Sequence, residues 1–82
     1  MQLSVLYFSV LRDVAGTDRE DLPMTRETLD VGSVIDIVLG KHPPLAEWNE
    51  KLLIAVNGEY ADRDTRVKPG DEVALMPPVQ GG

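Results

Sequence analysis

One stretch of the sequence has the strict period of an amphipathic helix. Apolar residues recur there at positions i, i+3, i+4, i+7 and i+8, and these are Val31, Val34, Ile35, Val38 and Leu39. Asp30 is a good N-cap just before this stripe, and Gly40 followed by Pro43 and Pro44 predicts its end. A helix of about three turns that is rich in β-branched residues depends on tertiary packing. We therefore expect the stripe to cover one face of a sheet.

Segments of alternating or continuous apolar character on both sides of this helix predict the strands of that sheet. The first strand is expected over residues 3–11 and the second over residues 19–24, where Pro23 confines it to an edge. A third strand is expected over residues 52–57, a short return strand around Tyr60, and a last strand over residues 72–76. Turns at Asn57-Gly58 and at Lys68-Pro69-Gly70-Asp71 separate them.

The resulting order is strand-strand-helix-strand-strand-strand. The first and last strands are the most apolar, so we expect them to be central neighbours, and a helical crossover allows them to run parallel. This order predicts an α+β fold of the β-grasp (ubiquitin-like) type, a mixed sheet of about five strands with one main helix packed across it. At 82 residues we expect a single domain over residues 1–82, with a flexible C-terminal Gly-Gly tail from about residue 77 to residue 82.

Composition and charge exclude several classes of function. The net charge of −6 argues against binding to nucleic acid or to an anionic membrane surface. The absence of cysteine excludes disulfides, cysteine-ligated clusters and a thiol nucleophile, so any sulfur carried by this chain must sit on its backbone terminus. The sequence has no apolar run of membrane-spanning length and no signal peptide at its N-terminus, which predicts a cytoplasmic location.

The internal residues offer no recognisable catalytic group. His42, the one histidine, is expected to be an exposed loop residue, and Ser9 and Ser33 lack a histidine partner at a recognisable spacing. Asp62 and Asp64 are better explained as a solvated loop than as a metal site, because nothing near them completes a ligand set. We therefore predict no metal, no bound cofactor and no enzyme activity of the chain by itself.

The C-terminal segment carries the strongest functional signal. Its last strand runs directly into Pro77 and Pro78, which stop sheet pairing, and the chain ends in Gly81-Gly82. A Gly-Gly end can thread a channel too narrow for any side chain; the alternative is an ordinary frayed terminus. A carboxylate is a poor electrophile at neutral pH, so a carrier role requires an ATP-using partner that forms an acyl adenylate on Gly82. Transfer of sulfide to that adenylate would leave a thiocarboxylate.

Four segments together resemble one protein family. They are LSVLYF at residues 3–8, VLRDVAG at 10–16, LIAVNG at 53–58 and GDEVALMPPVQGG at 70–82. Over essentially the whole chain they are similar to the small subunit of molybdopterin synthase, MoaD, and the C-terminal segment is the most specific of the four.

The resemblance implies that the chain is a sulfur carrier, the non-catalytic, sulfur-donating subunit of a sulfurtransferase. In this family a MoeB-like enzyme uses ATP to adenylate the terminal glycine, here Gly82, and a sulfur donor protein supplies the sulfur of the thiocarboxylate. The tail, which Gly81 keeps thin, then enters the large subunit, MoaE, and donates sulfur to cyclic pyranopterin monophosphate. Two such transfers build the dithiolene group of molybdopterin. The family enzyme is a heterotetramer of two small and two large subunits.

The resemblance also implies an apolar interface with partner proteins. By position it maps to Phe8, Tyr60 and Met76, and continues into Pro77, Pro78 and Val79. Strand alternation places Phe8 and Met76 on the faces opposite Val5/Tyr7 and Val73/Leu75, which agrees with that mapping. From alternation alone Phe8 fits either a strand buried on both faces or an exposed contact. Arg12 matches a commonly basic position, and either a structural hydrogen bond or a partner contact would explain it.

Three other functions fit the same residues. A thiazole-synthesis sulfur carrier, ThiS, shares the fold and the Gly-Gly thiocarboxylate but has a different acceptor, and such carriers usually lack the Pro-Pro-Val segment. A ubiquitin-like protein modifier begins with the same adenylate and then forms isopeptide bonds with lysines. A plain interaction domain with an inert tail is the third.

Overall fold

The structure, a computed structural model, describes residues 1–78. In chain order their elements are β1 (Gln2–Tyr7), α1 (Val10–Ala15), β2 (Arg19–Pro23), β3 (Leu29–Asp30), α2 (Val31–Lys41), the 3₁₀ helix η1 (Pro43–Lys51), β4 (Leu53–Val56), β5 (Glu59–Ala61), β6 (Arg66–Val67) and β7 (Glu72–Met76). The predicted tail from about residue 77 lies largely outside the described residues, and its flexibility stays a prediction.

Five strands form one mixed sheet in the order β2-β1-β7-β4-β5. The two central strands, β1 and β7, run parallel, and Val5 is paired with Val73. The remaining pairs, β1–β2, β7–β4 and β4–β5, are antiparallel. This confirms the predicted β-grasp arrangement, in which the ends of the chain supply neighbouring strands. Strand β2 is at an edge, where Pro23 removes a backbone donor without interrupting the sheet.

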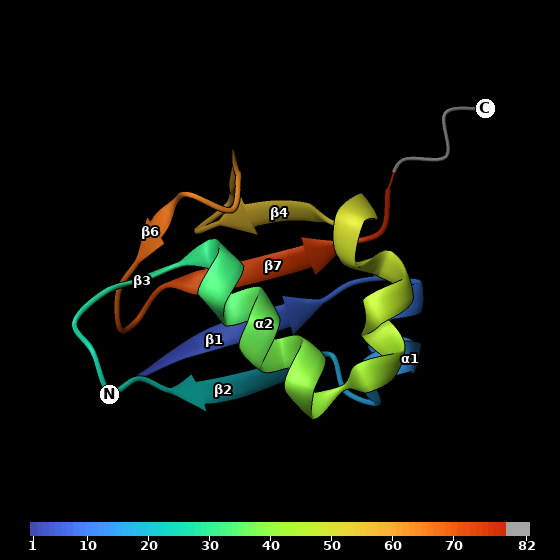
Figure 1. Ribbon diagram of the computed structural model, residues 1–82, viewed down its shortest axis with the longest axis horizontal. Helices are drawn as coiled ribbons and strands as arrows, with labels where there is room; N and C mark the ends of the chain where they lie inside the picture. Colours follow the sequence, from blue (N-terminus) through green and yellow to red (C-terminus); the bar gives the residue numbers. More distant parts are fainter. Residues whose placement is uncertain (79–82) are drawn as a thin grey trace.

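Helix α2 crosses one face of the sheet and buries the predicted stripe against it (Figure 1). The predicted N-cap is confirmed, since the Asp30 side chain accepts a hydrogen bond of 2.8 Å from the Ser33 amide. Apolar residues of the strands and of α1, α2 and η1 pack together and form one core between the helix and the sheet. The buried members are Leu3, Val5, Tyr7, Leu11, Leu22, Met24, Val31, Val34, Ile35, Val38, Leu45, Ile54, Val67, Val73 and Leu75.

The first strand was predicted too long, and two short strands were missed. The first strand ends at Tyr7, because Ser9 adopts a positive φ of 57° and the chain then turns into α1, where Leu11 is buried as a helical residue. Helix α2 ends at Lys41, between Gly40 and the two prolines that were predicted to end it, and Pro43–Lys51 after it form a nine-residue 3₁₀ helix. The two-residue strands β3 and β6, which pair with each other, were not predicted.

A polar cluster lies at the C-terminal end of α2, and it corrects the prediction for His42. The His42 side chain is only 19% exposed, and its Nε2 is 2.7 Å from Oε1 of Glu20 in β2. Tyr7 donates a hydrogen bond of 2.5 Å to the same oxygen, and Lys41 Nζ is 3.4 Å from Oε2. The cluster therefore joins the end of α2 to β1 and β2.

Candidate functional site

The sheet face opposite α2 is open and apolar. One row of paired residues crosses four strands on this face, because Leu6 pairs with Ala74, Ala74 with Ala55, and Ala55 with Tyr60. The two alanines in the middle of the row are small, whereas the residues at its ends are large. The side chains of the row are therefore short over β7 and β4 and long over the flanking strands β1 and β5.

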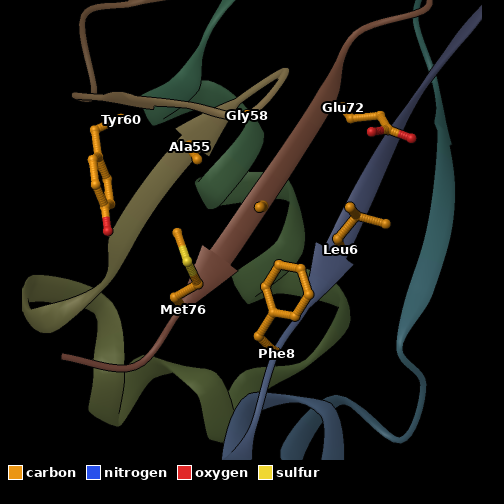
Figure 2. Close-up of a pocket in the computed structure, with 8 residues that line it drawn as sticks. Leu6, Phe8, Ala55, Gly58, Tyr60, Glu72 and Met76 are labelled. Carbon is orange, nitrogen blue, oxygen red and sulfur yellow. The ribbon is translucent and has the colours of Figure 1, made fainter. Parts of the chain in front are cut away.

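This difference in side-chain size creates a shallow hollow of about 360 Å³ on the open face. In Figure 2, Tyr60 and Leu6 stand on opposite sides of β7, and Phe8 and Met76 lie at the end of the strand. The residues that line the hollow, hereafter the outer-face hollow, are Leu6, Phe8, Ala55, Gly58, Tyr60, Glu72, Ala74 and Met76.

The structure brings together the three residues of the predicted interface. Tyr60 is 80% exposed and Phe8 is 45% exposed, which are unusual values for large apolar side chains, and Met76 is half-buried. The exposure of Phe8 favours the predicted contact over a strand buried on both faces. A contiguous apolar patch of this kind is typical of a protein interaction site.

Sequence reasoning missed the floor of the hollow. Leu6 and Ala74 share strand faces with Phe8 and Met76, so alternation alone could have placed them there. Glu72 shares the face of Ala74 and Met76 by the same alternation, whereas Ala55 and Gly58 join the hollow through pairing between strands, which no local pattern specifies.

The hairpin that carries Tyr60 is fixed to the start of β7. Asn57 and Gly58 have φ angles of 51° and 87°, as a tight β-hairpin turn requires. The Asn57 side chain accepts from the Glu72 amide at 2.9 Å and donates to Asp71 at 3.0 Å. Burial raises the pKa of the Asp71 carboxyl, but the hydrogen bonds from Asn57 and from Lys68 outweigh it and hold that pKa below its usual range. These contacts set the position of the hairpin relative to Glu72.

The C-terminal segment leaves the sheet at the outer-face hollow. Met76 is the last residue of β7, and the two prolines after it, Pro77 and Pro78, are half-buried. Of the other predicted site residues, Val79, Gly81 and Gly82 lie outside the described residues. Arg12 is exposed on α1 and does not line the hollow.

Two kinds of feature are absent from the described residues 1–78. In that range no group of three His, Cys, Asp or Glu side chains is placed to hold a metal ion. The same residues include no helix of the length and apolarity that crossing a membrane requires. What this part of the chain presents is an apolar hollow at the base of its C-terminal segment.

The sequence of the chain is similar to those of known proteins over nearly its whole length. The sequence profile of the ThiS family matches residues 5–82. A molybdopterin synthase sulfur carrier subunit of Mycobacterium tuberculosis is 36% identical over 83 residues, which cover 100% of this chain and 99% of that protein. The chain belongs to the family of molybdopterin synthase sulfur carrier subunits. The family predicted from the four sequence segments is thereby confirmed.

Solved structures of related proteins have the same β-grasp fold. One is a chain in the complex of subunits 1 and 2 of molybdopterin-converting factor from Helicobacter pylori, with a TM-score of 0.70, 28% identity and coverage of 100% of both chains. Another is small archaeal modifier protein 1 of Haloferax volcanii, with a TM-score of 0.82, 27% identity and coverage of 95% of this chain and 98% of that one.

Proposed function

We propose that this chain is the sulfur carrier subunit of a molybdopterin synthase and that its outer-face hollow docks on the large subunit. The observation that carries the proposal is the full-length similarity to molybdopterin synthase sulfur carrier subunits. The Helicobacter pylori relative, which forms a complex between subunits 1 and 2, supports a large subunit as the partner. The position of the hollow at the base of the C-terminal segment supports its use in docking.

The reactive group in this proposal is the C-terminal carboxylate of Gly82. A MoeB-like enzyme transfers AMP from ATP to that carboxylate and releases pyrophosphate. Sulfide delivered from a sulfur donor protein displaces AMP and leaves a thiocarboxylate, which is ionised and nucleophilic at neutral pH. The sulfur is then passed to cyclic pyranopterin monophosphate, and two such transfers build the dithiolene of molybdopterin.

The remaining residues of the segment deliver that group. Pro77, Pro78 and Val79 extend the interface beyond Met76, and two prolines in a row keep the backbone from pairing as a strand. Gly81 and Gly82 carry no Cβ, so the end of the chain fits a channel that would exclude a side chain. We further propose a cytoplasmic heterotetramer of two small and two large subunits.

The first test is the intact mass of N-terminally tagged protein purified gently from its own cells. The proposal predicts a mass increase equal to the exchange of one oxygen for one sulfur. If the mass is still unmodified after incubation with ATP, the activating enzyme and a sulfur donor, the sulfur-carrier function is excluded.

A second test replaces the terminal glycine. In the assembled synthase, Gly82→Ala should lower molybdopterin formation by about 100-fold, because a methyl group at the end of the chain displaces the reacting atom. Gly40→Ala is the matched control, since nothing lies within 4 Å of a Cβ at this exposed helical position. Molybdopterin formation by Gly82→Ala at the wild-type rate would contradict the narrow-channel argument.

A protein modifier is the second candidate, and the likeness to small archaeal modifier protein 1 favours it. The two functions share the adenylate. A modifier transfers its acyl group to a lysine, whereas a sulfur carrier transfers a sulfur atom to the pterin. Isopeptide-linked adducts to lysines of other proteins, found in the same purification, would favour the modifier function. A terminal thiocarboxylate without such adducts would favour the sulfur carrier.

A further inference from the structure

The outer-face hollow has one charged residue on its rim. Among the described residues that line it, Glu72 alone is charged, and its side chain is 49% exposed. Its backbone is fixed on two sides, by the parallel pairing with Ser4 and by the hydrogen bond from its amide to the Asn57 side chain. The carboxylate is therefore held at the edge of an apolar surface, where a charge on a docked partner would meet it.

Arg19 of the edge strand β2 is the nearest cation to this carboxylate. Its Nη2 donates a hydrogen bond of 2.9 Å to Ser4 Oγ, and its guanidinium is 3.9 Å from Glu72 and 3.9 Å from Asp21. Both ion pairs are long and the Arg19 side chain is 55% exposed, so each pair is weak. One arginine thus lies between two carboxylates and neutralises neither of them fully.

We propose that the outer-face hollow receives an apolar side chain of the large subunit that is flanked by a lysine or arginine, whose cation pairs with Glu72. Arg19 is an internal counter-ion that competes with the partner's cation for the same carboxylate. This inference rests on the proposed function, because it describes the partner of the same surface. The net charge of −6 acts in the same direction, since it attracts a basic partner at long range.

The charge distribution disfavours a second copy of this chain as the occupant. A symmetric dimer through the outer-face hollow would enclose the Glu72 carboxylates of both chains in one interface and would join two chains of charge −6. Like charges across an interface oppose association, so the rim favours a partner of opposite charge.

The experiment measures the affinity of the whole chain for the large subunit of molybdopterin synthase from the same organism, by calorimetry at low and high salt. Glu72→Gln should weaken binding about three-fold at low salt, because the partner's cation loses its pair. Arg19→Gln should have the opposite sign and tighten binding about two-fold, since Glu72 is released to the partner. Both differences should disappear near about 1 M salt.

The control is Asp36→Asn, which removes the same charge from an exposed position on α2, at the other face of the sheet. It should reproduce the wild-type affinity at each salt concentration once the small change in net charge is allowed for. A wild-type chain that does not bind the large subunit at all would overturn the proposed function. Normal binding with Glu72→Gln indistinguishable from Asp36→Asn, or weaker binding by Arg19→Gln, would overturn this inference alone. A wild-type dimer that Tyr60→Ala dissociates would also overturn it, in favour of a second copy.

Discussion

The two faces of the central strands are built from similar side chains but lie in different environments. On β7, Val73 and Leu75 point under α2 and are buried, whereas Ala74 and Met76 point to the open face and are half-buried. At the end of β1, Tyr7 is buried, whereas the next residue in the chain, Phe8, is 45% exposed. Apolar side chains are therefore present on both faces, and only one face is covered by the helix.

This difference separates two roles within the same strands. The covered face stabilises the fold, because its side chains leave water when the chain folds. The open face leaves Tyr60, Phe8 and Met76 in contact with water, which costs solubility and contributes little to folding. Variants on the two faces should consequently affect two different measurements.

The test with the largest expected effect replaces two adjacent residues of β7 with alanine, one in each variant. Leu75→Ala should lower the free energy of unfolding by about 3 kcal/mol, because Leu75 is 1% exposed and its removal leaves a cavity in the core. Met76→Ala is the matched variant on the open face and should lower it by less than about 1 kcal/mol. Urea denaturation measures both. Equal losses of unfolding free energy in the two variants would show that the two faces contribute equally to stability.

The second test concerns binding instead of stability. Tyr60→Ala should leave the free energy of unfolding within about 0.5 kcal/mol of the wild-type value, since the side chain is 80% exposed. It should weaken binding to the large subunit by about 2 kcal/mol, or about 30-fold, as is typical of an aromatic anchor in an interface. Calorimetric titration measures the affinity. Ile37→Ala, which removes an exposed apolar side chain from α2, is the control and should bind normally.

The covered face was largely predictable from the sequence. The stripe of α2, its cap at Asp30 and the alternation in β1 and β7 are local patterns, and each of them is confirmed. The tight turn at Asn57-Gly58 was predictable for the same reason, because two adjacent residues specify it.

Features set by contacts between distant residues were not predictable in the same way. Strands β3 and β6 have two residues each, which is too short to show a period. The burial of His42 depends on Glu20, which is 22 residues away in the chain. The floor of the outer-face hollow depends on the order β1-β7-β4-β5, so Ala55 could not be assigned to it before the pairing was known.

The polar cluster around Glu20 is the exception on the covered side of the sheet, and it provides the smallest of the expected effects. Burial raises the pKa of the Glu20 carboxyl, but hydrogen bonds from Tyr7 and His42 and the charges of His42 and Lys41 outweigh burial and hold that pKa below its usual range. Burial, and then the hydrogen bond to Glu20, raise the pKa of the Tyr7 hydroxyl well above its usual range. Tyr7 therefore keeps its proton at neutral pH and donates it to Glu20 in a hydrogen bond.

A carboxyl whose pKa is lower in the folded state stabilises the protein above its unfolded pKa, and this stabilisation is lost as the pH falls through the folded pKa. Glu20→Gln should therefore lower the free energy of unfolding by about 1 kcal/mol at neutral pH, because the charged partner of Tyr7, Lys41 and His42 is removed. The difference from wild type should shrink as the pH falls through the lowered pKa of the Glu20 carboxyl, because the wild-type carboxyl is then itself protonated. Urea denaturation across this range measures it, and a difference that stays constant with pH would show that the packing of Glu20, and not its charge, stabilises this end of α2. Binding to the large subunit should be unchanged, since the cluster lies on the covered side of the sheet and does not line the outer-face hollow.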